Sequence, residues 1–65
     1  MEWNRRQITR DGMVLDYIPN GASTIITETY RGEHRVIGEM VNAVAERHWS
    51  DRVVSDGWRA VTLTA

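Results

Sequence analysis

The chain has 65 residues and no cysteine, so neither a disulfide bond nor a thiolate metal site can stabilise it. Eight basic and nine acidic side chains give a net charge of −1, which lacks the basic excess of a strong nucleic-acid binder. No run of about 18 apolar residues, the length that spans a membrane, occurs in it. We therefore expect a single small domain over residues 1–65, outside the membrane.

Small size limits the stability of such a domain. A chain of this length buries only about 60% of the surface that its unfolded form exposes. Its core then supplies about 3–5 kcal/mol of net folding stability unless another interaction adds to it. Because cysteine is absent and no disulfide can form, association of two copies is the source of stability that remains, and we expect a homodimer.

Composition also suggests a source and a compartment. All eight basic residues are arginine, and the chain has no lysine and no phenylalanine. Since lysine and phenylalanine codons are AT-rich, this bias indicates a bacterium with a high-GC genome or one of its bacteriophages. The segment 1–6 lacks the apolar core of a signal peptide, so the expected compartment is the cytoplasm.

The first half of the chain predicts strands joined by tight turns. Glu2 to Arg10 is either an edge strand with a bulge or an arm that packs only through Trp3, because Trp3 and Ile8 have opposite parity. Asp11-Gly12 predicts a two-residue hairpin turn, and Asn20-Gly21 predicts another. The strands between and after these turns are expected at 13–18 and 22–30, the second rich in Thr and Ile.

The stretch from Glu33 to Trp49 predicts the one long helix. Its apolar residues recur with helical period: Val36, Ile37, Met40, Val41, Val44, Ala45 and Trp49. A competing interpretation places a hairpin around Arg31-Gly32-Glu33 and begins the helix near Gly38. The continuous stripe favours the first interpretation, although a glycine within a helix costs about 1 kcal/mol relative to alanine.

Two short strands complete the prediction. They are expected at Arg52–Ser55 and Trp58–Thr64, on either side of an Asp56-Gly57 turn. The predicted fold is therefore α+β: a small antiparallel sheet in the order β-β-β-α-β-β, with one amphipathic helix at about 33–49 packed across one face.

No motif in the sequence supports catalysis, a cofactor or a metal site. His34 and His48 would stand at the two ends of the predicted helix, about 21 Å apart at 1.5 Å per residue, too far to share a metal ion. Asp16 and Glu28 could lie on neighbouring strands, but so small a chain offers little of the concave volume that shifts a catalytic pKa. No serine lies in a nucleophile-elbow pattern. We expect a protein that is not an enzyme.

Binding to another protein is the leading hypothesis. The candidate contact residues are Trp3, Arg5, Arg6 and Arg10, since tryptophan and arginine are frequent anchors at protein interfaces. The alternative is a nucleic-acid-binding or transcription-regulating module that uses the same arginines on phosphates. The competing structural interpretation is that these arginines block sheet-to-sheet aggregation at an edge and that Trp3 packs over the rim of the sheet.

Overall fold

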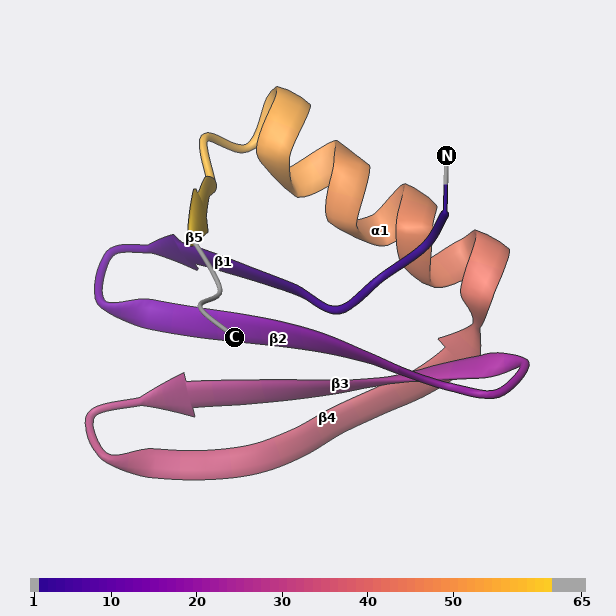
Figure 1. Ribbon diagram of the computed structural model, residues 1–65. Helices are drawn as coiled ribbons and strands as arrows, with labels where there is room; N and C mark the ends of the chain where they lie inside the picture. The colour runs from indigo at the N-terminus through magenta and orange to yellow at the C-terminus, as the bar shows by residue number, and fades with distance from the viewer. Residues whose placement is uncertain (1, 62–65) are drawn as a thin grey trace.

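The computed structural model describes residues 2–61, which form one antiparallel five-stranded sheet with a single helix on one face (Figure 1). This is the α+β class that the sequence predicts. The elements are β1 (Arg6–Arg10), β2 (Met13–Asn20), β3 (Ser23–Tyr30), β4 (Glu33–Val41), α1 (Asn42–Ser55) and β5 (Arg59–Val61). The strands lie in the order β4-β3-β2-β1-β5, so β4 and β5 are the two edges.

The predicted position of the helix is wrong over its first half. Residues 33–41 form β4, which pairs antiparallel with β3, and the helix begins only at Asn42. The element order is thus β-β-β-β-α-β. The cause is the turn before β4, in which Arg31 (φ 51°) and Gly32 (φ 80°) both have positive φ. A type I′ hairpin requires this pair of conformations, so the chain turns back along β3. The competing interpretation, with a hairpin around Arg31-Gly32-Glu33 and a helix that begins later, is closer to the structure.

A β-bulge in β4 explains the misleading apolar period. Gly38 pairs with Ile26 and Val36 pairs with the adjacent Thr27, so Ile37 is an extra residue without a partner on β3. The extra residue shifts the alternation of side chains along the strand. The apolar residues of β4 therefore occur as two adjacent pairs, Val36-Ile37 and Met40-Val41. Because these pairs are four residues apart, their spacing resembles the apolar face of a helix.

The end of the chain also departs from the prediction. Residues 52–55, expected as a strand, form the last turn of α1. The backbone amides of Asp56 and Trp58 both donate to the carbonyl of Arg52, at 3.1 Å each, and so close the helix. The strand expected at Trp58–Thr64 is present as β5, which pairs with β1, and its predicted part beyond residue 61 lies outside the described residues.

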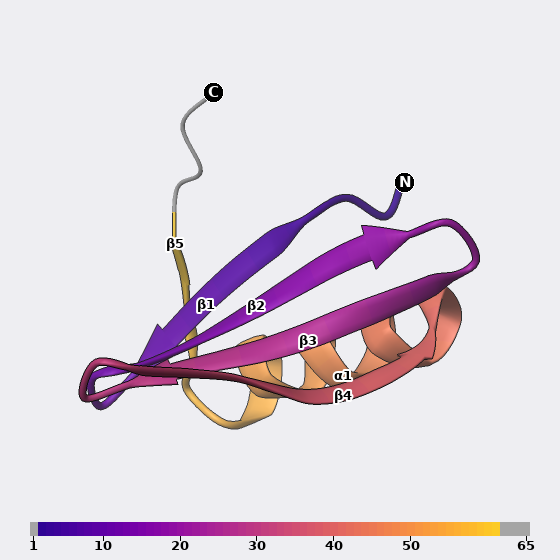
Figure 2. The same cartoon turned by 90° about the horizontal axis from the view of Figure 1, so that it is seen from below.

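The core lies between α1 and one face of the sheet. Ladder pairing places Ile8 beside Leu15 and Tyr17 beside Ile26, so these four side chains share a face. All four are buried, together with Ala45 of α1 and Trp58. Trp49 and Val53 of α1 pack against them, which is the part of the predicted helical stripe that the helix retains. No described element covers the opposite face, here called the helix-free face (Figure 2).

A chain of polar contacts fixes where α1 begins. The hydroxyl of Thr24, which is fully buried, donates to Asn42 Oδ1 at 2.8 Å. The side-chain amide of Asn42 donates to the carbonyl of Gly21, and its backbone amide donates to the carbonyl of Ala22. The first residue of the helix is thereby bound to the β2–β3 hairpin.

The left-handed conformation of the β3–β4 turn makes a first prediction. Gly32→Ala should lower the free energy of unfolding by about 1–2 kcal/mol, because alanine is strained at a φ of 80° even though no atom lies within 4 Å of the added methyl group. Gly38→Ala is the matched control, since its site is equally open and its φ is not positive. We expect it to be neutral or to stabilise by about 0.5 kcal/mol. Urea denaturation of both variants measures the difference, and equal losses would contradict the turn assignment.

Candidate functional site

The four predicted contact residues do not form one surface. Trp3 lies in the irregular segment before β1 and packs against the core. Its indole Nε1 donates to Thr24 Oγ1 at 2.9 Å, and its ring meets Tyr17 edge-on at a centroid distance of 6.2 Å. Because residues 2–5 lie outside the strand, the parity conflict between Trp3 and Ile8 does not arise. The side chain predicted as an anchor thus holds the N-terminal segment on the helix side of the sheet.

Arg6 stacks on the same aromatic group. Its guanidinium carbon lies 5.0 Å from the ring centroid of Trp49 and 6.0 Å from that of Trp3. These are cation–π distances. Arg6 therefore covers the Trp3–Trp49 pair and belongs to the packing between β1 and α1.

A hollow of about 280 Å³ adjoins this stack. It is lined by Arg5, Arg6, Gln7, Trp49, Ala60 and Val61. Two donors of its lining side chains, Arg6 Nε and Trp49 Nε1, are buried and bond to no described residue. Since neither atom has appreciable surface, a ligand in the hollow could not reach them without displacing the stack.

Arg10 lies at the far end of β1 from the stack. It donates to the backbone carbonyl of Asp56 at 2.7 Å, and its guanidinium carbon lies 5.1 Å from the ring centroid of Trp58. Its Nε also lies 3.5 Å from a carboxylate oxygen of Asp11, an exposed pair that contributes little. Arg10 thus connects the β1–β2 turn with the end of α1.

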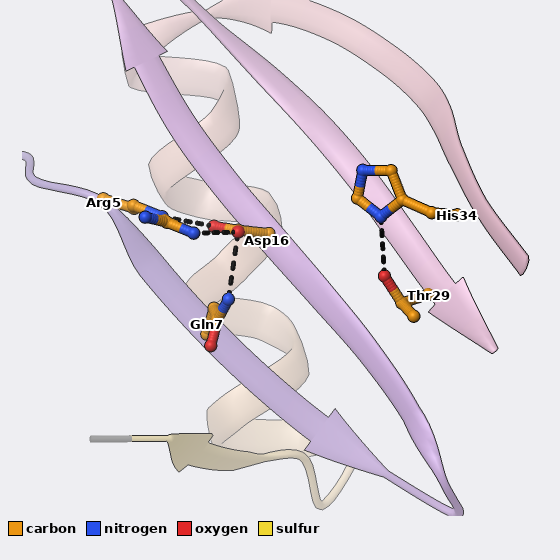
Figure 3. Close-up of polar contacts among 5 residues, drawn as sticks. All are labelled: Arg5, Gln7, Asp16, Thr29 and His34. Atoms are coloured by element: carbon orange, nitrogen blue, oxygen red, sulfur yellow. Dashed lines mark hydrogen bonds and ion pairs between the residues drawn. The ribbon is translucent and has the colours of Figure 1, made fainter. Parts of the chain in front are cut away.

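Arg5 belongs to a polar network on the helix-free face (Figure 3). Its Nε and Nη2 donate to the two carboxylate oxygens of Asp16 at 3.0 and 2.6 Å, a bidentate pair. Gln7, on the neighbouring strand, donates to the same carboxylate at 3.0 Å. Burial alone would raise the pKa of Asp16, but the hydrogen bonds from Arg5 and Gln7 and the charge of Arg5 outweigh it, so this pKa is lowered. The carboxylate is ionised and its acceptors are engaged.

The two carboxylates that the sequence placed on neighbouring strands lie apart. Asp16 pairs with Thr27 in the ladder, and Glu28 pairs with Leu15, so the two acids project from opposite faces. Glu28 accepts from Arg35 of β4 at 3.0 Å. Each acid is thus bound to its own arginine, and the two do not form an acid–base pair.

The two histidines are also on opposite sides of the sheet. His34 lies on β4, where its Nδ1 is 2.7 Å from the hydroxyl of Thr29 on the helix-free face (Figure 3). His48 lies on α1, where its Nδ1 is 2.7 Å from the hydroxyl of the fully buried Tyr17. The expectation that both stand on one helix is therefore wrong. Residues 2–61 contain no group of three or more His, Cys, Asp or Glu side chains that could hold a metal ion.

The feature that sequence reasoning missed is the edge strand β4. Among its nine residues are three exposed aliphatic side chains: Val36 (66% exposed), Ile37 (44%) and Val41 (58%). Val44, in the first turn of α1 just beyond β4, is also exposed. On the edge away from β3, the backbone groups of β4 have no strand beside them among the described residues. An uncovered apolar edge of this length is the usual template for pairing with another chain.

Comparison with known proteins adds no functional information. No family model, no curated protein and no solved structure matches the chain. No helix within residues 2–61 is both long enough and apolar enough to cross a membrane. Any proposal for the function therefore depends on the geometry of the chain itself.

The Tyr17–His48 contact makes a prediction about pH. Burial, and then the charge of Arg52, lower the pKa of His48 below its ordinary 6.5, with Asp51 acting in the opposite sense. Burial also raises the pKa of Tyr17 to about 12, so its hydroxyl remains a donor to the neutral imidazole. Because the unfolded chain takes up the proton first, stability is full above pH 6.5 and falls as the pH drops below it.

His48→Asn should remove this dependence, since an asparagine oxygen can accept near the position of Nδ1 without titrating. The free energy of unfolding, measured by urea denaturation between pH 7.5 and pH 5, should then become flatter. Val54→Asn, at an exposed position of the same helix, is the control and should retain the wild-type slope. Equal slopes in wild type and His48→Asn would show that the contact does not titrate as described.

Proposed function

We propose that the chain is a small non-enzymatic protein that acts by protein–protein contact through β4. The observation that supports this is the exposure of Val36, Ile37 and Val41 on an unpaired edge. Main-chain hydrogen bonds to an incoming strand would supply affinity, and the exposed valines would be covered on binding. A pairing edge also suits a chain whose own core is small.

The contact residues proposed from sequence have a different part in this function. Trp3 and Arg6 pack between the N-terminal segment and α1, and Arg5 is held by Asp16. Their internal partners favour a supporting role, in which they keep the sheet rigid while β4 makes the contact. Of the four, Arg10 and Arg5 remain partly open to solvent and could lie at the rim of an interface.

Nucleic-acid binding is the weaker alternative. Phosphate recognition needs several cationic groups on one surface. Arg5 lies on the helix-free face and Arg6 on the other, and each has an intramolecular partner, as has Arg10. The net charge of −1 adds no general attraction to a polyanion. A shift of a DNA or RNA oligonucleotide at low salt, lost steeply as salt is added, would favour this alternative over protein contact.

A capture experiment with matched variants tests the proposed function. The purified chain is used as bait in a bacterial lysate alongside Val36→Glu, in the centre of β4, and Val54→Glu, on the exposed side of α1. Both valines are exposed, so neither change removes a buried side chain. A protein that binds wild type and Val54→Glu should bind Val36→Glu at least about tenfold more weakly, because a charge would be placed in an apolar contact.

The comparison is completed with the captured protein in pure form, by titration against each variant. Circular dichroism confirms that both variants keep the native secondary structure. If the captured protein has the same dissociation constant for wild type and Val36→Glu, then β4 is not the contact element and the proposal fails.

A further inference from the structure

We infer that the partner that β4 fits is a second copy of this chain, paired antiparallel about a two-fold axis through Val36. This inference rests on the proposed function, since it names an occupant for the same edge. The argument starts from the charges along β4, which limit how two copies of this strand can lie side by side.

Ladder positions along β4 follow its pairing with β3. Gly38 takes the position next to Val36, because Ile37 is the extra residue of the bulge. In an antiparallel pair with a two-fold axis normal to the sheet, directly opposed residues project from the same face. With the axis at Val36, this residue faces its own copy, Arg35 faces Gly38, and His34 faces Glu39.

This register brings complementary groups together. Val36 is the most exposed residue of β4 with an apolar side chain, and it would be covered by the other Val36 at the centre. On each side, a histidine of one copy faces a carboxylate of the other, and both belong to the helix-free face. Gly38 leaves room for the longer side chain of Arg35. No like charges are opposed along the paired length.

Other symmetric registers fit less well. An axis at Arg35 would oppose two guanidinium groups, and an axis at Glu39 would oppose two carboxylates, each of which is destabilising. An axis at His34 would pair Glu33 with Arg35 but would use only the first residues of β4 and leave Val36 without a partner. An axis at Gly38 pairs as many positions without opposing like charges, but it places Val36 against Glu39 and leaves His34 without a carboxylate opposite it. The axis at Val36 is the register that avoids like-charge contacts, covers Val36 with its own copy and brings His34 opposite Glu39.

The absence of cysteine from the chain provides a register-specific test. In the proposed dimer, Cys side chains from Val36→Cys would face each other across the axis, within reach of a disulfide bond. Those from Val41→Cys would lie eight ladder positions apart, about 26 Å at 3.3 Å per residue. Val54→Cys, on the helix, is a control for random collision.

The wild-type chain at micromolar concentration should have the mass of a dimer by light scattering, and Val36→Glu should have that of a monomer. Under mild oxidation, Val36→Cys should form the disulfide dimer at least about tenfold faster than Val41→Cys or Val54→Cys. A dimeric chain in which Val36→Cys is no faster than the controls would overturn the register. If the wild-type chain is a monomer, the inference that a second copy pairs with β4 is wrong.

These outcomes are separate from that of the capture experiment. Light scattering and cross-linking use the pure chain alone, whereas capture measures binding to a different protein. A monomeric chain whose capture still depends on β4 would refute the dimer and leave the proposed function standing. A Val36 dimer whose bound proteins are unaffected by Val36→Glu would refute β4 as the contact element for other proteins.

Discussion

The buried hydroxyl of Thr24 is the contact on which the arrangement of this small domain depends. It accepts from Trp3 and donates to Asn42, and so joins the N-terminal segment, β3 and the start of α1. A buried polar group left without a partner costs about 1–3 kcal/mol. Displacing either Trp3 or Asn42 would leave at least one such group, in a domain whose total stability is of similar size. The three segments are therefore held to one geometry.

The exposed edge is a consequence of this geometry. Because the helix begins at Asn42 beside the β2–β3 hairpin, it runs back over the centre of the sheet, where Ala45 and Trp49 meet the core. The segment that leads into it must reach this point from the β3–β4 turn, and it does so as a nine-residue strand along β3. One short helix covers the centre and leaves the outer side of β4 open (Figure 1).

The features that could be predicted from the sequence are those set by local chemistry. The Asp11-Gly12 turn has the positive φ values that its residues favour, and the two-layer α+β architecture follows from hairpins and one helix. The start of the helix could not be predicted for two reasons. Arginine is an unusual residue at a positive φ such as the 51° of Arg31, so the turn before β4 has no clear sequence signal. The bulge at Ile37 also gives the apolar residues of β4 a spacing that resembles that of a helix. Propensity is a weak guide where pairing with β3 decides the conformation.

The site was harder to predict than the fold, because it depends on register. Arg5 meets Asp16 only because β1 and β2 pair as they do, and Arg6 reaches Trp49 only because α1 lies over β1 at that point. Neither relation is visible in the spacing of residues along the chain. The exposed valines of β4 were counted instead as part of the core, since a helical assignment places them on its buried face.

The proposed dimer would give the polar network of the helix-free face a further significance. A two-fold axis normal to the sheet places both helices on the same side, so the two helix-free faces would join into one continuous surface. On that surface Asp16 neutralises Arg5 within each copy, and Glu39 of one copy would lie opposite His34 of the other. Such a surface carries little net charge and is rich in threonine, valine and isoleucine. It would suit a protein surface of mixed polarity better than the phosphate backbone of a nucleic acid.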